Sequence, residues 1–180
     1  MEKVKEKLTT IKLEVLFIIV LLAIVIIAGL AIFTMATKNK NIDNFKEDAK
    51  SILSVAKNIY PALEKSNNTD YIHTSDDGTS KAVCITITGL EENDYLTKKY
   101  KNWNGYVVVE KTNNEYTYTL WGTNKKYVYN EIDLLSIEKS SIDKEITKYQ
   151  KEEFERSVKT SFKGKNDKRY YGECISKKID

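Results

Sequence analysis

The stretch TTIKLEVLFIIVLLAIVIIAGLAIF, residues 9–33, decides the fold, because it stays apolar over a longer distance than a soluble core requires. No ionisable side chain occurs from Val15 to Ala36, a run of about 22 residues whose helix would be roughly 33 Å long. That length crosses the hydrocarbon core of a bilayer, where a lone segment satisfies its backbone groups only as a helix. We therefore expect one membrane-spanning helix over residues 15–36, surrounded by membrane lipid.

The rest of the chain is arranged around this run. We assign residues 1–14 to a short arm, 37–66 to an amphipathic continuation of the helix, and 67–180 to one small domain. Lysines flank both ends of the run, so the positive-inside rule does not orient it. The shortness of the arm favours a cytoplasmic amino terminus and an extracytoplasmic domain, in a protein that crosses the cell membrane once.

A cleaved secretory signal is the alternative for this run. Such signals have an apolar centre of about 7–15 residues followed by a small-x-small cleavage site. The run here is longer, and TKNKNIDNF, residues 37–45, offers no convincing site. We therefore expect an anchor that stays in the protein.

The continuation carries the spacing of an amphipathic helix. Its apolar residues recur at alternate intervals of 3 and 4, which places them on one helix face that needs a packing partner. Pro61 disfavours helical geometry at Tyr60 and predicts an end or a kink there. The apolar face consists of Ile42, Phe45, Ala49, Ile52, Ala56, Ile59 and Leu63.

Several segments downstream have strand character, with β-branched runs or with alternating apolar and polar residues. The turns TNN and GTN between them suit hairpins. An antiparallel sheet with one apolar face packed on the long amino-terminal helix gives an α+β fold. The predicted strands are residues 81–88, 105–111, 115–122 and 125–130.

Two further helices are expected. Thr88 precedes Glu91 by 3 residues, the spacing of a capping box, which predicts a short helix through Tyr95. Apolar residues from Ile142 to Phe162 recur at helical intervals and predict a carboxyl-terminal helix within the region 131–180.

This layout resembles that of the type IV pilins and the type II secretion pseudopilins. That family has a short basic leader, a helix that opens with a motif of the form GFTLIEVL, an apolar run, an amphipathic continuation and a small sheet domain. TTIKLEVL matches the motif at Glu14, Val15 and Leu16. The resemblance covers the chain to about residue 130. It implies a structural subunit that assembles with other pilin-like subunits and their assembly machinery into an envelope filament.

The resemblance also gives roles to residues at the mouth of the run. In the family, the carboxylate that matches Glu14 neutralises the terminal amine of a neighbouring subunit. The leader peptidase of the family cuts between a small residue and an aromatic one, whereas the corresponding pair here is Thr9 and Thr10. A prepilin peptidase is therefore a partner only if it accepts this non-standard site. Lys12 stands where the family has an apolar residue and could supply the cation for Glu14, within the chain or from a neighbour. In the alternative interpretation both side chains simply reach the interface.

Cys84 and Cys174 are the only cysteines. In an extracytoplasmic domain the simplest expectation is a disulfide, which would tie the otherwise unassigned tail to the first long strand. The loop closed would hold about 90 residues, worth up to roughly 4–5 kcal/mol in the chain-entropy model. Two independent buried thiols are the alternative.

No catalytic, cofactor or metal site is expected. His73 is the only histidine and lies in the polar loop DYIHTSDDG, without a serine elbow or a phosphate-binding loop beside it. Asp70, Asp76 and Asp77 in this loop could contact calcium, but their spacing fits no EF-hand.

Nucleic acid is not the expected partner either. YLTKKYKNWNGY, residues 95–106, interleaves lysines with aromatic residues, as single-stranded nucleic acid requires. The predicted exported part, however, has a net charge of only about +2. The aromatic residues are better explained as packing between sheet and helix. Two functions remain open: a pilin-like filament subunit, or a membrane-anchored extracellular binding domain that never polymerises.

Overall fold

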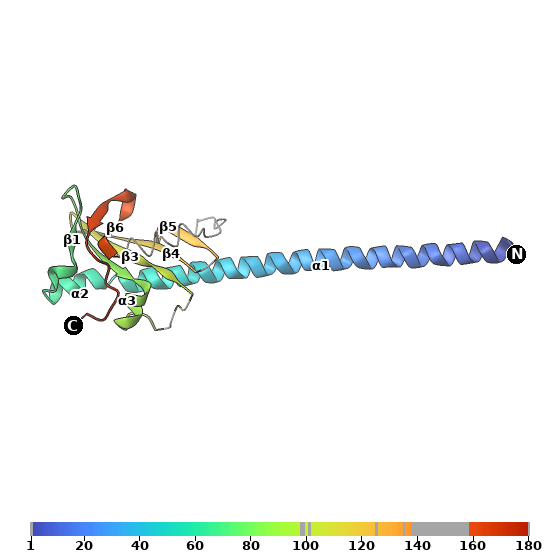
Figure 1. Cartoon of the computed structure of the whole chain (residues 1–180), viewed down its shortest axis with the longest axis horizontal. Helices are drawn as coiled ribbons and strands as arrows, with labels where there is room; N and C mark the ends of the chain where they lie inside the picture. Colours follow the sequence, from blue (N-terminus) through green and yellow to red (C-terminus); the bar gives the residue numbers. More distant parts are fainter. Residues whose placement is uncertain are drawn as a thin grey trace. The chain divides into compact units, whose positions relative to one another are not determined.

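The computed structural model describes residues 2–97, 100, 102–124, 126–134, 136–137 and 159–179, with the side chains of residues 2–14 and 16 left out. The chain forms two compact units, Met1–Asp43 and Asn44–Asp180. Helix α1 (Glu2–Ala56) runs through the first unit and contributes its last turns to the second (Figure 1).

Helix α1 ends earlier than the sequence predicts. It stops at Ala56, a turn follows at Lys57 and Asn58, and the short helix α2 (Ile59–Lys65) begins directly afterwards. Pro61 lies in the first turn of α2, where a backbone N–H needs no helical partner and the fixed φ of proline suits the helix. The proline therefore starts a new helix instead of ending the old one at Tyr60.

The second unit is an α+β domain with an antiparallel sheet in the order β1-β2-β3-β4-β5 and a separate hairpin of β6 and β7. This confirms the predicted fold class. The elements after α2 are η1 (Thr69–Tyr71), β1 (His73–Thr74), β2 (Lys81–Thr86), α3 (Ile87–Glu92), β3 (Asn104–Thr112), β4 (Glu115–Thr123), β5 (Val128–Asp133), β6 (Ser161–Lys163), η2 (Lys165–Asp167) and β7 (Arg169–Tyr171).

The β3–β4 hairpin confirms the predicted turn at TNN. Thr112 pairs with Glu115, so the loop has only Asn113 and Asn114. Their φ angles are 50° and 67°, the left-handed values that a type I′ turn needs and that asparagine tolerates better than most residues.

One face of the sheet packs on the helices. Tyr116 and Leu120 share this face because they alternate along β4, and the Tyr116 ring meets the Tyr60 ring of α2 edge-on at 5.6 Å. Through the strand register the same face includes a set of fully buried aliphatic side chains. These are Val83, Ile85, Val107, Val109 and Leu120.

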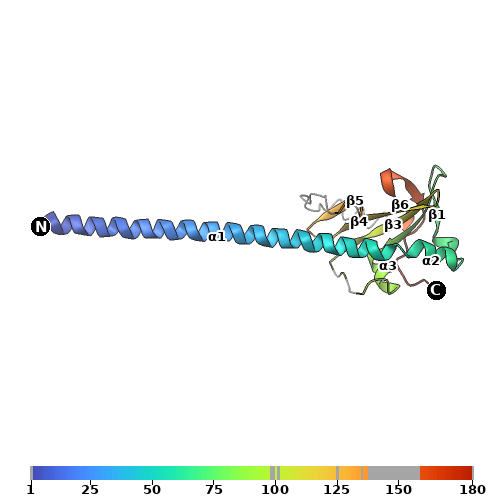
Figure 2. The same ribbon diagram turned by 180° about the vertical axis from the view of Figure 1, so that it is seen from behind.

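The other face is covered by the β6–β7 hairpin and the residues that follow it. Figures 1 and 2 both show β6 on the side of the sheet away from the last turns of α1. Both faces of the central strands are therefore buried, whereas the sequence predicted one. The buried cluster on this face comprises Ala82, Cys84, Tyr106, Val108, Val128, Phe162, Tyr170 and Cys174.

Two helix predictions need correction. Helix α3 begins at Ile87, and Thr86 is its cap: the Thr86 hydroxyl accepts a hydrogen bond from the N–H of Gly89 at 2.8 Å. Strand β2 ends at Thr86 in extended geometry, so this residue takes the cap position that was predicted for Thr88. Phe162, predicted on a carboxyl-terminal helix, lies in β6; the rest of that prediction, residues 142–158, falls outside the described residues.

Candidate functional site

The apolar part of α1 is the first candidate. Between Val15 and Met35 the described large apolar side chains are exposed all round, from 46% at Leu21 to 70% at Ile32. A helix that is apolar on every side needs an apolar environment, either lipid or other helices. By length and composition this helix is long and apolar enough to cross a membrane, and it is the one such helix in the described part of the chain.

The four residues predicted to matter just before the apolar segment all lie within α1. Thr9, Thr10, Lys12 and Glu14 have helical backbone, and the helix continues through them without interruption. Their side chains are outside the described residues. Their assignment to leader cleavage and subunit assembly therefore stays a prediction.

An aromatic cluster fixes the last turns of α1 against the sheet. The Phe45 ring stacks on Trp103 at 4.6 Å and on Tyr129 of β5 at 4.8 Å. The Trp103 indole N–H also donates to the Asp48 carboxylate at 3.1 Å. Phe45 is fully buried and Trp103 is 8% exposed. The aromatic residues of the 95–106 stretch thus serve packing at Trp103, as expected, while Lys98, Lys99 and Lys101 lie outside the described residues.

A second contact joins α2 to the β3–β4 hairpin. Lys111 donates to both carboxylate oxygens of Glu64, at 2.7 and 3.0 Å, and its ammonium lies 5.6 Å from the ring centres of Tyr60 and Tyr116. Burial, followed by the nearby Glu64 charge, raises the pKa of Tyr60 to about 12. Tyr60 therefore stays neutral and acts as packing.

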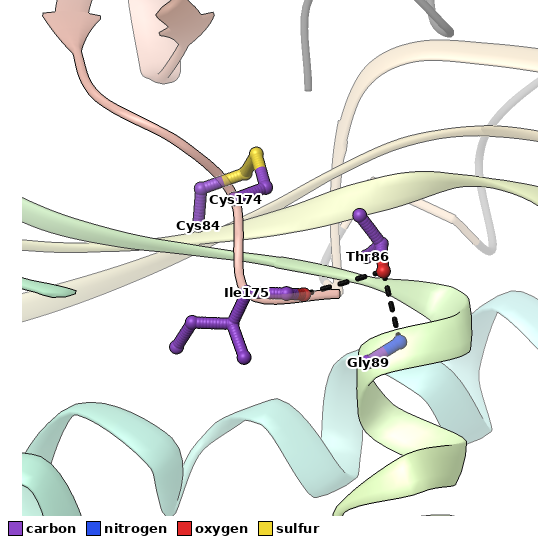
Figure 3. The surroundings of a disulfide bond; sticks show 5 residues. All are labelled: Cys84, Thr86, Gly89, Cys174 and Ile175. Atoms are coloured by element: carbon purple, nitrogen blue, oxygen red, sulfur yellow. Dashed lines mark hydrogen bonds between the residues drawn. A yellow bond between two sulfur atoms is a disulfide. The ribbon is translucent and has the colours of Figure 1, made fainter. Parts of the chain in front are cut away.

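The predicted disulfide is confirmed. Cys84 of β2 and Cys174 are bonded, with their Cα atoms 4.5 Å apart, and both are almost fully buried. The bond fixes the chain after β7 to β2 (Figure 3). This assigns a place to the tail that the sequence left open.

The tail, residues 173–179, adds a short strand-like segment to β2. The Ile175 N–H donates to the Cys84 carbonyl at 2.8 Å, and the Thr86 N–H donates to the Ile175 carbonyl at 2.9 Å. The Thr86 hydroxyl donates to the same carbonyl at 3.2 Å while it caps α3 at Gly89 (Figure 3). The tail thus covers part of the β2 edge that the two-residue strand β1 leaves unpaired.

A buried carboxylate holds the β6–β7 hairpin on the sheet. Glu110 of β3 is 3% exposed; it accepts a hydrogen bond from the Tyr170 hydroxyl at 2.6 Å and one from the Lys165 N–H at 2.6 Å. The Tyr170 hydroxyl also shares a hydrogen bond with the Ser80 hydroxyl at 2.6 Å. Burial, followed by the bond to Glu110, raises the pKa of Tyr170 well above its usual value. Tyr170 therefore remains a neutral donor.

His73 of β1 packs against the β6–β7 hairpin and is not a solvated loop residue. Its ring is partly buried, meets Phe162 edge-on at 5.7 Å, and lies where a side chain at Gly172 would collide with it. Burial lowers the pKa of His73, partly offset by a hydrogen bond with the backbone of Glu173. Its Nε2 atom has no hydrogen-bond partner among the described residues.

The acidic loop is a turn held by its own side chains. The Asp77 carboxylate accepts hydrogen bonds from the Ser75 hydroxyl at 2.6 Å and from the Thr79 N–H and hydroxyl at 3.0 and 2.8 Å. These bonds lower the pKa of Asp77 far below its usual value. Within the described residues, no group of at least 3 His, Cys, Asp or Glu side chains has the arrangement of a metal site.

Sequence reasoning missed Glu110, Tyr170 and Ser80. A glutamate in a strand of otherwise buried valines, VVVEK, was the available signal, because carboxylates are almost never fully buried without a partner. The partners lie far along the chain, in a segment with no recognisable pattern. Only the folded structure brings them together.

Comparison with known proteins gives no family, no curated protein and no solved structure that matches this chain. The architecture itself is informative. A long apolar amino-terminal helix, whose last turns pack on an antiparallel sheet, together with a disulfide, is compatible with a pilin-like fold.

Proposed function

We propose that this protein is a pilin-like or pseudopilin-like structural subunit of a filament in the cell envelope, of the type IV pilus or type II secretion type. Residues 15–36 would lie in the membrane before and during assembly, with the sheet domain on the extracytoplasmic side. The observation that carries the proposal is helix α1, which joins an apolar segment exposed on all sides to turns buried beneath the sheet, without a break from Glu2 to Ala56.

This continuity supports a filament subunit over a simple tether. A tethered binding domain works with a flexible linker, and loops and linkers rich in glycine or proline normally supply one. Between Leu30 and Tyr60 the chain has neither glycine nor proline, and it is helical up to Ala56. A helical connection without glycine or proline is what a subunit built around one long amino-terminal helix requires.

The charges at the mouth of the apolar segment suggest how neighbouring copies would be held. Lys12 and Glu14 are two positions apart in a helix, and residues at this spacing do not face each other. Each would therefore meet its counter-charge on another copy more readily than within its own chain. An ionisable residue that enters the hydrocarbon core is costly without such a partner. In this arrangement Glu14 and Lys12 set the register between subunits.

Charge exchange at these two positions tests the proposal. Full-length copies with two different tags are co-expressed, and their co-purification from membranes is measured. We expect Glu14→Lys and Lys12→Glu each to reduce co-purification strongly, because like charges would then oppose each other. The double variant should restore it. The matched controls are Lys5→Glu and Glu6→Lys in the arm, which should leave co-purification unchanged.

Membrane insertion of every variant is checked by carbonate extraction, so that loss of assembly is separated from loss of the anchor. Single variants that co-purify as well as the unmodified chain would contradict the proposal and favour the membrane-anchored binding domain that does not polymerise. The amino-terminal mass of the protein from its own membranes gives independent evidence: a chain that begins at Thr10 would indicate a prepilin peptidase as a processing partner.

A further inference from the structure

The tail rests in a seat built by β2 and α3. We define the tail seat as Cys84, Thr86, Gly89 and Asn93. Cys84 and Thr86 offer a backbone carbonyl and N–H to the tail, as described above, and the Asn93 side chain donates to the Lys177 carbonyl at 2.8 Å and accepts from the Ile179 N–H at 2.8 Å. The hydrogen bonds between seat and tail thus reach backbone atoms of the tail.

Gly89 makes room for this approach. A Cβ atom at position 89 would collide with the backbone carbonyl of Ile175, so glycine is the residue that lets the tail come close to α3 (Figure 3). The tail side chains Cys174 and Ile175 are themselves buried, at 5% and 4% exposed. Backbone pairing along a strand edge with pockets for a few side chains is the way in which sheets bind extended peptides.

One glycine, Gly172, links the tail to strand β7, and its N–H donates to the Thr160 carbonyl at 3.0 Å. Strand β7 ends at Tyr171, and Gly172 follows with a φ of 153°, a value that glycine adopts far more readily than other residues. The tail begins directly after this glycine. Its attachment to the seat rests on the disulfide, on hydrogen bonds from the backbone and side chains of the seat, and on two buried side chains.

We propose that the tail seat is a binding site for an extended peptide segment, and that in the chain with reduced cysteines the tail of a second copy occupies it in place of the chain's own tail. The second copy is the fitting partner because its tail carries the same Cys174 and Ile175 that the seat accepts. The Cys84–Cys174 disulfide holds the chain's own tail in the seat and so prevents the exchange. This inference goes beyond the filament proposal and does not depend on it.

A covalent trap between two full-length variants tests the exchange. Cys174→Ser retains the thiol of the seat, and Cys84→Ser, with a different tag, retains the thiol of the tail. The two are mixed in detergent with oxidised glutathione, which takes up two electrons and the two thiol protons and leaves as two molecules of reduced glutathione. We expect a heterodimer linked from Cys84 to Cys174, in excess over random pairing of the two thiols, on a non-reducing gel.

Blocking the seat supplies the decisive control. Gly89→Ala in the copy that retains Cys84 should abolish the heterodimer, whereas Gly29→Ala in the same copy should not, since no atom lies within 4 Å of a Cβ at position 29. Asn93→Ala, which removes the two hydrogen bonds to the tail and one to the Gly89 carbonyl without adding atoms, should lower the yield several-fold and serves if Gly89→Ala does not fold. Absence of the heterodimer, or a yield that neither seat variant reduces, would overturn the proposal.

Discussion

The two faces of the five-stranded sheet are closed by different physical means. On the helix face, Phe45 stacks between Trp103 and Tyr129, and the aliphatic side chains around them are fully buried. On the opposite face, which we call the clasp face, the cover is the β6–β7 hairpin with its tail. There a buried carboxylate, Glu110, and the Cys84–Cys174 disulfide accompany the apolar contacts.

The contacts on the two faces therefore differ in how strongly redox state and pH affect their contribution to stability. Apolar and aromatic packing does not change with redox state or, to first order, with pH. A disulfide responds to reductants, and a partly buried histidine responds to acid. The helix face is therefore the constant part of the domain, and the clasp face is the part that conditions can loosen.

The largest effect is expected on the helix face. Phe45→Ala removes the ring that stacks on both Trp103 and Tyr129 and leaves a cavity, so the free energy of unfolding should fall by about 3–5 kcal/mol. Guanidinium unfolding of the full-length protein in detergent, followed by tryptophan fluorescence, measures this loss.

Phe33→Ala is the matched control for that experiment. It removes the same side chain from the same helix, but Phe33 is 69% exposed and lies in the apolar segment. Its unfolding midpoint should equal that of the unmodified protein. If Phe33→Ala lowered the midpoint as much as Phe45→Ala, the distinction between the two parts of α1 would be wrong.

A smaller effect is expected at Glu110 on the clasp face. Glu110→Leu leaves the Lys165 N–H without its acceptor and leaves the Tyr170 hydroxyl with Ser80 as its partner, at a cost of about 1–3 kcal/mol for the lost buried hydrogen bonds. Glu110→Gln should cost less, because the amide oxygen still accepts one bond and the Tyr170 hydroxyl can accept from the amide NH2. Equal losses for Leu and Gln would show that the amide does not replace the carboxylate as an acceptor, and no loss for either would show that Glu110 acts through its volume alone. Glu115→Gln, at an exposed position, serves as the control.

The helix face was predictable because its signals are local. The spacing of apolar residues around Phe45 extends over a few helical turns. The alternation of Tyr116, Thr117 and Tyr118 lies within one strand. Together these two patterns indicate an amphipathic helix packed on a sheet. The break at Lys57 was not predictable from the same signals, because Pro61 is compatible both with a helix end and with the first turn of a new helix.

The clasp face was predictable only through its cysteines. Cys84 and Cys174 are the only two cysteines, so their disulfide could be predicted without knowing how the chain between them folds. Glu110 and Tyr170 carry no such label, since glutamates and tyrosines are numerous and the hydrogen bond joins residues 60 positions apart. Phe162 was misassigned because its spacing from preceding apolar residues also fits a helix, and a short strand such as β6 is fixed by its neighbours.

The smallest effect concerns pH at the seam between β1 and β7. Burial lowers the pKa of His73 below its value of 6.5 in the unfolded chain, so below this pH the unfolded state binds a proton that the folded state resists. The stabilisation due to neutral His73 is therefore complete above pH 6.5 and is lost as the pH falls toward the lower, folded-state pKa. The unfolding midpoint of the unmodified protein should decline from pH 7.5 to pH 5.5 more than that of His73→Gln, which has no group titrating there. The difference between the two slopes gives the contribution of His73 to the pH dependence of stability. Parallel slopes would show that the His73 ring is hydrated in the folded protein. The clasp face would then not respond to acid through this residue.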